Sequence, residues 1–377
     1  MSGSRAWLSS TIRRAVDGTL KSPDKDTDGG GWLIPMANTL IGHVERGGVF
    51  TRAEAEAVME ELLSGRVETA EIVRLLTAMN RRAVGAAELT GFASVMRKFA
   101  APVFDAGEVL PLQMVDTCGT GGDGFDAFNV STAAAIVAAA AGARVAKHGN
   151  RAASSRSGSA DVLEALGVRI DATLARMGRA IREVGIGFLF APAAHAATRH
   201  AMPARKQVGV KTIFNLLGPL TNPAGAQSQV MGVFSAEAID VVAETLAELG
   251  VERALVVHGA GGLDEISLAG ETMIADVERG FVRRYTVLPE DFEIDAAPLE
   301  AIRGGTAAEN AGMIRAILAG ESGARRDIVV VNAAAALVAA GVAENFAEGA
   351  TIAARAISSG AAQRKLAELV AFTRDGN

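Results

Sequence analysis

The sequence predicts an α/β fold in which a small all-helical domain is followed by a larger domain built on a mainly parallel sheet. Apolar residues recur at helical spacing through residues 36–101, with no strand pattern among them. From residue 108 onward, helical and strand-like stretches alternate, which is typical of a parallel sheet covered by helices. We therefore expect a disordered N-terminal extension at 1–35, a helical domain at 36–107 joined by part of 195–220, and an α/β domain at 108–377.

Composition limits the class of protein. The chain has 377 residues, enough for a large core, and 49% of them are hydrophobic. The formal charge of −6 argues against a nucleic-acid surface. The single cysteine, Cys118, cannot form an intrachain disulfide, and the longest apolar run, 133–141, is too short to cross a membrane. We expect a cytoplasmic protein with neither a membrane nor a nucleic acid as partner.

Each expected helix of the N-terminal domain has its own signal. Thr51 followed by Glu54 forms a capping box, and an apolar face follows it at 58–63. Thr69 begins a second helix, and Ala86–Phe99 forms a third. We expect this domain to supply core and dimer contacts and no catalytic group.

The larger domain alternates between the two element types. Residues 272–288 alternate more loosely than the rest, as an antiparallel addition to the sheet would. The region 307–375 is helical again. Strands are expected at 109–115, 144–147, 186–190, 229–234 and 254–258, and helices at 133–141, 160–166, 173–184 and 236–249.

Two polar loops follow neighbouring strands in the chain. Residues 116–124 read Asp-Thr-Cys-Gly-Thr-Gly-Gly-Asp-Gly, and residues 148–159 form a second loop before a helix. Glycines let the backbone approach a ligand, and a helix N-terminus favours negative charge. Residues 127–160 contain no Asp or Glu, so their cations form a local positive exception in an acidic chain. The two loops predict a ligand with phosphate at both ends, beside four cations: Arg144, Lys147, Arg151 and Arg156.

The first loop also matches the dinucleotide pattern G-x-G-x-x-G through Gly119, Gly121 and Gly124. That kind of site needs an acidic residue about 20 positions further on, to bind the ribose hydroxyl. Basic residues, Arg144 and Lys147, occupy this place instead. No Lys-Ser/Thr follows the glycines, which excludes a P-loop. A phosphorylated sugar is therefore favoured over a nicotinamide cofactor.

Two adjacent carboxylates, Asp264 and Glu265, stand in a glycine-rich loop after the expected strand 254–258. Such a pair is usually solvent-exposed, but sites in α/β proteins assemble after strand C-termini. Mg²⁺ binds one or two carboxylates together with phosphate oxygens and waters. The pair therefore predicts a magnesium site.

A cationic stretch lies between the expected strands at 186–190 and 229–234. It holds six basic side chains within a short span, without matching acids. A solvated face and a ligand-binding face are about equally favoured by this pattern. The six residues are His195, Arg199, His200, Arg205, Lys206 and Lys211.

Three stretches together resemble the signatures of the anthranilate phosphoribosyltransferase family: 116–124, Asn129-Val130-Ser131-Thr132, and 147–155, which reads Lys-His-Gly-Asn-Arg-Ala-Ala-Ser-Ser. The resemblance runs from about Met36 to the C-terminus. It implies a nucleoside-phosphorylase-like, phosphoribosyltransferase fold. It also implies transfer of the phosphoribosyl group of 5-phosphoribosyl 1-pyrophosphate to anthranilate, in tryptophan biosynthesis, by a homodimer that uses two Mg²⁺ ions.

The resemblance also implies roles for individual residues. Arg205 would hold the carboxylate of anthranilate, with Gly119 and Asn150 against its ring. Ser131 and Glu265 would hold one magnesium, and Asp264 and Glu265 the other. No residue is implied as acid or base; Lys147, Asp264 and Glu265 would act electrostatically, the carboxylates through magnesium. The phosphoribosyl substrate would contact Gly119, Gly122, Asp123, Ala127, Asn129, Val130, Ser131, Thr132, Lys147, His148, Gly149, Asn150, Arg151, Ala152, Ala153, Ser154, Ser155 and Ser159.

Two alternatives remain open at this point. A pyrimidine-nucleoside phosphorylase shares the fold and a Lys-His motif, but it would use phosphate and would not need Asp264 and Glu265. A non-catalytic nucleic-acid-binding relative would lack the carboxylate pair and carry a basic surface. The chain also departs from the family at Ala127, where Thr or Ser is usual; the lost hydroxyl contact is expected to weaken substrate binding by about 0.5–1.5 kcal/mol.

Overall fold

The computed structural model describes residues 36–105, 107–108, 113–122, 124–152 and 156–375. The extension expected to be disordered at 1–35, and residues 109–112 of the first expected strand, lie outside the described residues. So do four of the predicted site residues, Asp123, Ala153, Ser154 and Ser155.

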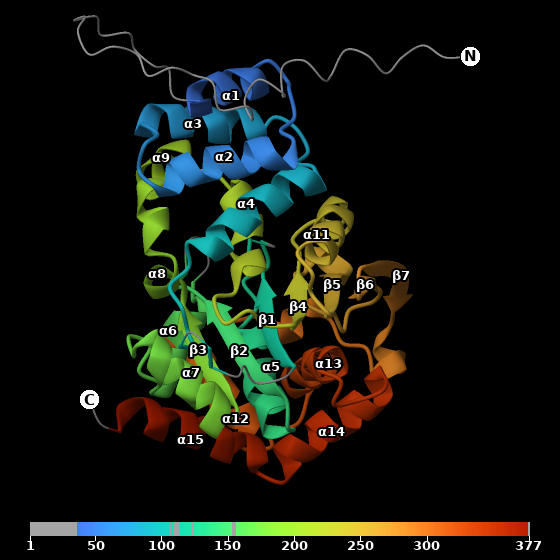
Figure 1. Ribbon diagram of the computed structural model, residues 1–377. Coiled ribbons are helices and arrows are strands. Elements are labelled where there is room, and N and C mark those ends of the chain that lie inside the picture. The colour runs from blue at the N-terminus through green and yellow to red at the C-terminus, as the bar shows by residue number, and fades with distance from the viewer. Residues whose placement is uncertain (1–35, 106, 109–112, 123, 153–155, 376–377) are drawn as a thin grey trace, which may run out of the picture. The chain divides into compact units, whose positions relative to one another are not determined.

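In the described residues, four α-helices precede the first strand (Figure 1). Thr51 caps the second helix: its Oγ1 accepts a hydrogen bond from the Glu54 amide at 3.3 Å, and the Glu54 carboxylate accepts one from the Thr51 amide at 2.8 Å. The predicted capping box is therefore confirmed. The helices are α1 (Met36–Glu45), α2 (Arg52–Leu63), α3 (Thr69–Met79) and α4 (Ala86–Lys98).

Seven strands of the described residues form one sheet, in the order β3-β2-β1-β4-β5-β6-β7. The first five in this order run parallel, and the last two pair antiparallel. The mainly parallel sheet and its antiparallel addition are thus confirmed. The strands are β1 (Met114–Gly119), β2 (Arg144–Gly149), β3 (Ile186–Phe190), β4 (Ser228–Gly232), β5 (Arg253–Gly259), β6 (Thr272–Glu278) and β7 (Phe281–Val287).

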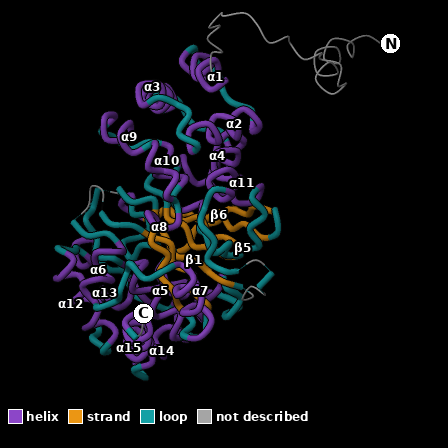
Figure 2. The backbone as a smooth tube through the Cα atoms, turned by 60° about the vertical axis from the view of Figure 1, so that its left-hand side comes forward, coloured by secondary structure: helices purple, strands orange, loops and turns teal. Residues whose placement is uncertain are grey.

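Helices cover both faces of the sheet (Figures 1 and 2). On one face, α5 (Val130–Ala140) and α13 (Ala324–Ala339) pack against each other and against β1. Both are alanine-rich and buried, which allows close approach of helix to sheet. On the other face α11 (Glu237–Glu248) packs on β5 and β6. The remaining helices of this part are α6 (Ser159–Leu166), α7 (Leu174–Glu183), α12 (Ala307–Leu318), α14 (Phe346–Ser358) and α15 (Ala361–Arg374).

Between β3 and β4 the chain returns to the N-terminal helices. Buried Ala204 and Phe214 belong to the same apolar cluster as the inner faces of α1 to α4, and α9 (Met202–Val208) contacts α3. The same cluster continues into the face of the sheet that α11 covers. This segment contains α8 (Ala191–Ala194), α9 (Met202–Val208) and α10 (Ile213–Leu217).

One boundary differs from the expectation in a way that matters for the site. The strand expected at 109–115 continues through Asp116 to Gly119, because these residues pair in parallel with 229–232 of β4. The first four residues of the glycine motif are therefore strand rather than loop. Cys118, expected in the loop, lies buried in β1 instead.

A helix that crosses a bilayer needs about 20 mostly apolar residues. Among the described residues, no helix is both long enough and apolar enough to span a membrane.

Candidate active site

Four parallel strands that lie side by side in the sheet, β2, β1, β4 and β5, each end in a glycine. At each of these positions a Cβ atom would collide with a nearby group. A Cβ on Gly119 would lie 2.3 Å from Asp264 Oδ2, and one on Gly232 would lie 1.6 Å from the Asp264 carbonyl oxygen. Gly149 leaves room for Ser159 Oγ, and Gly259 for the Glu265 carbonyl oxygen. The glycines therefore leave room at the C-terminal ends of these strands for Asp264, Ser159 and the Glu265 backbone.

The loop that carries Asp264 and Glu265 passes over these strand ends. Asp264 Oδ2 accepts a hydrogen bond from the Gly121 amide at 2.7 Å. Glu265 Oε1 accepts one from the Ser131 amide, in the first turn of α5, at 3.0 Å. The structure thus brings together the three residues predicted to hold magnesium, although they are 134 positions apart in sequence at the widest.

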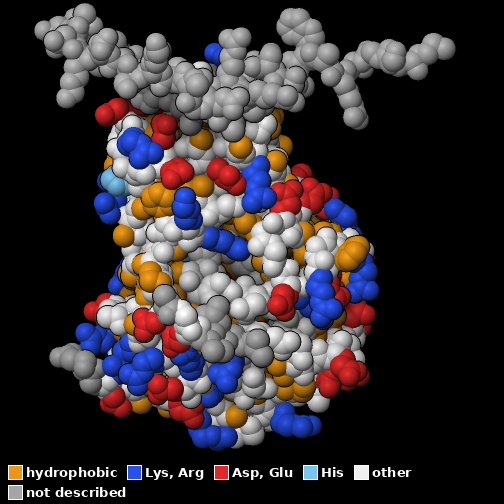
Figure 3. Space-filling view, viewed as in Figure 1, with side chains coloured by type: hydrophobic (Ala, Val, Ile, Leu, Met, Phe, Trp, Pro, Cys, Tyr) orange, Lys and Arg blue, Asp and Glu red, His pale blue; other side chains and the backbone are white. Residues whose placement is uncertain are grey.

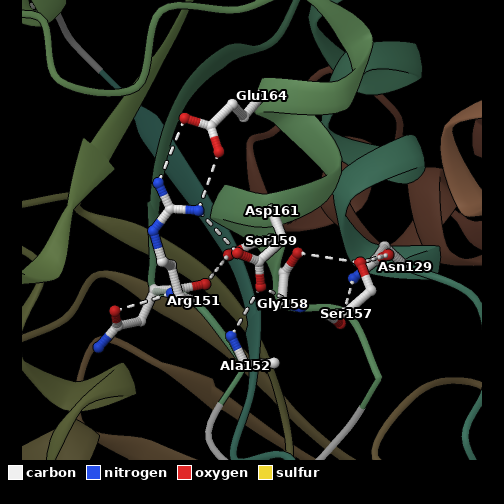
Figure 4. A network of polar contacts seen from close by, with 9 residues as sticks. Asn129, Arg151, Ala152, Ser157, Gly158, Ser159, Asp161 and Glu164 are labelled. Atoms are coloured by element: carbon white, nitrogen blue, oxygen red, sulfur yellow. Dashed lines mark hydrogen bonds and ion pairs between the residues drawn. The ribbon is translucent and has the colours of Figure 1, made fainter. Parts of the chain in front are cut away.

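Asn129, which directly precedes α5, bonds to residues outside this helix. Its side-chain amide donates to the Ser157 carbonyl at 3.0 Å (Figure 4). Ser157 Oγ donates to Asn129 Oδ1 at 3.1 Å, and Asn310 Nδ2 donates to the same oxygen at 2.9 Å. The start of α5 and the end of the second loop are therefore held together, as a ligand that spans both loops requires.

The second loop is tied to α6 by carboxylates. Asp161 Oδ2 accepts hydrogen bonds from the amides of Ala152 and Gly158, each at 2.9 Å (Figure 4). The Arg151 guanidinium reaches Asp161 at 2.8 Å and Glu164 at 2.9 Å. Asp161 and Glu164 lie just beyond the stretch 127–160, which contains no Asp or Glu.

The expected local excess of positive charge is therefore wrong for this fold. Arg151 is paired with two carboxylates, and the Arg156 guanidinium lies 3.7 Å from a Glu309 carboxylate oxygen. Arg144 donates to two backbone carbonyls of the α7 region instead of facing a ligand. Two of these carboxylates, Asp161 and Glu164, directly follow the acid-free stretch, and the third, Glu309, comes from α12, far along the chain. On the face drawn in Figure 3, basic and acidic side chains are likewise interspersed.

The fourth cation, Lys147, is buried beneath the first loop. Its ammonium donates to the Thr117 carbonyl and lies 3.5 Å from Ser131 Oγ. Burial lowers the pKa of Lys147, and the neighbouring Asp116 opposes this shift. Burial also raises the pKa of Asp116 to about 6, against the opposing effect of Lys147 and a hydrogen bond from Asn222. Lys147 thus supports the Ser131 turn from below.

Two histidines meet beside the second loop. The rings of His148, at the end of β2, and His195, after α8, have centroids 5.1 Å apart. Burial, above all, lowers the pKa of His148 to about 3, and burial lowers the pKa of His195 as well. Both Nε2 atoms are buried and have no hydrogen-bond partner among the described residues. Nothing in the sequence spacing indicated this pair, because the two residues lie on different elements.

Arg205 lies on α9, with its guanidinium 5.1 Å from the centre of the Phe214 ring. Burial lowers the pKa of this arginine. Within the described residues, no carboxylate forms an ion pair with it. A partly buried guanidinium without a counter-ion suits an external carboxylate, because a fork of donors matches its two oxygens.

A cavity of about 470 Å³ lies elsewhere, lined by Arg253, Tyr285 and Phe346 among others. Several of its lining residues belong to β7, the edge strand that is separated from β1 by β4, β5 and β6, so the cavity lies to one side of the two polar loops. Ligands of open α/β sheets bind at the carboxyl ends of the strands. Cavity volume therefore does not identify the site in this protein, whereas the strand ends do.

Comparisons with known proteins agree with this arrangement. Residues 38–100 match the family model described as glycosyl transferase family, helical bundle domain, and residues 112–363 match glycosyl transferase family, a/b domain. Fold and site together define a glycosyl transferase.

Curated relatives narrow this class. The anthranilate phosphoribosyltransferase of Pelotomaculum thermopropionicum is 52% identical over 90% of this chain and 97% of its own length. That of Symbiobacterium thermophilum is 50% identical over 89% of this chain and 97% of its own. The crystal structure of the Thermus thermophilus enzyme has a TM-score of 0.83 and 46% identity, covering 89% of this chain and 99% of that one. The chain belongs to the anthranilate phosphoribosyltransferase family.

Membership decides between the functions left open by the sequence. The chain is an enzyme that transfers the phosphoribosyl group of 5-phosphoribosyl 1-pyrophosphate to anthranilate, and the phosphorylase and nucleic-acid-binding alternatives are not favoured. A yeast anthranilate phosphoribosyltransferase solved in complex with PRPP and Mg has a TM-score of 0.80 at 25% identity, covering 90% of this chain and 99% of that one.

Proposed function

We propose that the transfer depends on Mg²⁺ and takes place across the loops that follow β1 and β2. The observation that carries this proposal is the position of Asp264 and Glu265. Their carboxylates accept hydrogen bonds from Gly121 and Ser131, one in the glycine loop and one in the first turn of α5. A metal-binding pair, a glycine loop and a helix N-terminus thus share one end of the sheet.

Two magnesium ions are proposed, one held by Ser131 and Glu265 and the other by Asp264 and Glu265. When bound, the ions supply positive charge that stabilises the departing pyrophosphate. Hydroxyl and carboxylate oxygens are the donors that Mg²⁺ prefers. Among the described residues, no group of three His, Cys, Asp or Glu side chains offers an all-protein metal cage. The donor set therefore suits a cation that takes its other ligands from the substrate and water.

The reaction breaks the bond between ribose C1 and the pyrophosphate oxygen, and forms a bond from C1 to the anthranilate nitrogen. Backbone amides and hydroxyls align the two substrates, which supplies part of the rate enhancement. A poorly basic aromatic amine loses its proton readily once it is bonded to carbon, so no side chain is assigned as a base. The proposed phosphoribosyl contacts come from Gly119, Gly122, Asp123, Ala127, Asn129–Thr132, Lys147–Ser155 and Ser159.

Anthranilate is proposed to lie against Gly119 and Asn150, with its carboxylate on Arg205. The guanidinium of Arg205 is partly buried against Phe214, so a carboxylate would bind there in a region of reduced solvent screening. The Asn150 side chain accepts a hydrogen bond from the Arg151 amide at 2.7 Å, which sets the direction of its own amide group.

The protein is further proposed to be a cytoplasmic homodimer, with a helical domain at 36–107 and an α/β domain at 108–377. The buried free thiol of Cys118 is consistent with a reducing compartment. Light scattering on the purified chain measures the mass of the particle, and a monomer at micromolar concentration would contradict the dimer.

The deciding experiment follows the loss of anthranilate fluorescence on addition of phosphoribosyl pyrophosphate and Mg²⁺. We expect turnover that requires all three components and stops when the metal is chelated. Incubation with thymidine and phosphate is the matched control, and turnover there instead would overturn the proposal.

A further inference from the structure

Lys211 lies over the glycine loop, although it follows α9 and is far from that loop in sequence. Its ammonium donates a hydrogen bond to the Gly122 carbonyl. The aliphatic end of the side chain covers the same residue, since a Cβ on Gly122 would lie 2.4 Å from Lys211 Cε. Gly122 also has φ of +75°, a conformation that glycine adopts without strain.

The position of Lys211 is fixed from two other directions. Its ammonium lies 3.9 Å from the centre of the Phe234 ring, just beyond β4. Its backbone carbonyl accepts a hydrogen bond from Asn80 Nδ2, at the end of α3, at 2.8 Å. Contacts at both ends of the residue reduce the freedom of a side chain that is otherwise exposed and flexible.

The electrostatic state of Lys211 differs from that of the cations in the second loop. Arg151 and Arg156 each have a carboxylate within 4.0 Å, whereas no carboxylate of the described residues lies that close to the Lys211 ammonium. Its partners among the described residues, a carbonyl oxygen and an aromatic face, carry no formal negative charge. Such a charge over a glycine loop is suited to a phosphate group.

The neighbouring contact indicates which phosphate this is. Gly121 and Gly122 are adjacent, so their Cα atoms are about 3.8 Å apart. The amide of Gly121 is bound by Asp264, and the carbonyl of Gly122 is bound by Lys211. The ammonium therefore contacts the residue next to the one that Asp264 binds, and Asp264 is proposed to hold magnesium.

We propose that Lys211 binds the pyrophosphate of the substrate and stabilises it as it departs. This inference rests on the proposed function of the loop and adds a cation that neither the glycine motif nor the carboxylate pair contains. The ammonium has three donors, so it can bind a phosphate oxygen while it retains the Gly122 carbonyl. Lysine here acts as a point charge, without the fixed geometry of a guanidinium.

The test compares Lys211→Met, Lys211→Arg and the matched control Lys206→Met, which removes an exposed charge from the same cationic segment. Methionine keeps the stem over Gly122 and removes the charge. We expect Lys211→Met to weaken binding of inorganic pyrophosphate with Mg²⁺, measured by calorimetry, by roughly ten- to a hundredfold, the loss of a charged hydrogen bond. Binding of ribose 5-phosphate should change less than about twofold, and Lys211→Arg should restore most of the loss.

The pattern of the two affinities separates this role from a structural one. If Lys211 only shaped the loop, Lys211→Met would weaken ribose 5-phosphate and pyrophosphate equally, and restoring a positive charge with arginine would not help; that result would overturn the inference. An unchanged pyrophosphate affinity would also overturn it. Wild-type turnover from phosphoribosyl pyrophosphate and anthranilate, measured alongside, tests the proposed function separately, because it does not depend on any variant.

Discussion

The backbone of Asp264 passes so close to Gly232 that a Cβ atom there would lie 1.6 Å from the Asp264 carbonyl oxygen. Gly232 ends β4 and pairs with Gly119 at the end of β1, so the two glycines face Asp264 from neighbouring strands. The position of the carboxylate is therefore set by the absence of two side chains as much as by its own hydrogen bond to Gly121.

Gly232→Ala should displace Asp264 and lower kcat/KM by more than about tenfold, because backbone atoms cannot accommodate a methyl group at that distance. Gly312→Ala is the matched control. A Cβ on Gly312, in α12, would meet nothing within 4 Å, and alanine should raise the free energy of unfolding by about 0.5–1 kcal/mol. Kinetics and thermal melting measure both effects. Equal activity of the two variants would show that Asp264 is not constrained by Gly232.

Asp264→Asn combined with Glu265→Gln should remove most turnover and shift the melting temperature by only a few degrees. The amide oxygens can still accept the hydrogen bonds from Gly121 and Ser131, so the loop keeps its anchors while it loses charge. Rates are measured across a magnesium titration. Near-normal turnover at low Mg²⁺ would contradict the metal role.

Arg205→Ala should raise the KM for anthranilate far more than the KM for phosphoribosyl pyrophosphate. Loss of a charged hydrogen-bonded pair costs about 2–4 kcal/mol in kcat/KM, or roughly 30- to 1,000-fold. Aniline has the amine and no carboxylate, so its smaller rate should fall less in the variant. An equal loss for both acceptors would assign Arg205 to the phosphates or to the fold.

Acid should destabilise the protein through His148. Its folded-state pKa is lowered to about 3 from the ordinary 6.5, so the unfolded chain binds a proton that the folded chain excludes. The contribution to stability is present above pH 6.5 and is lost as the pH falls toward 3, amounting to about 2 kcal/mol between pH 7 and pH 5. Urea unfolding of His148→Gln should show a correspondingly flatter pH dependence than that of the wild type. The same slope in both proteins would contradict this account.

The elements of the fold could be predicted where the signal is local. The capping box at Thr51 and the alternation of strand and helix depend on neighbours in sequence, and both are confirmed. The end of β1 was missed because Asp-Thr-Cys-Gly has no strong strand propensity of its own. Pairing with β4 makes it a strand, and that partner is over a hundred positions away.

The candidate site also has a part that could be predicted from local sequence and a part that depends on contacts made only in the folded chain. The glycine loop and the carboxylate pair could be found by motif, since each is contiguous. The charge state of the second loop could not, because Glu309 and Glu164 reach it only in the folded chain. The contact of Lys211 with Gly122 was equally inaccessible, as it joins residues 89 positions apart.

The four glycines at the strand ends also affect how variant data on this enzyme should be interpreted. A screen that scores growth or turnover will rank Gly232 and Gly259 beside the residues that bind substrate, since one added methyl group displaces the backbone of Asp264 or of Glu265. A loss of activity on substitution by alanine at these positions shows that there is no room for a side chain. It does not show that the residue binds substrate or takes part in the reaction. Residues that bind substrate are distinguished by their response to a change of charge or donor at constant size, a comparison that glycine does not permit.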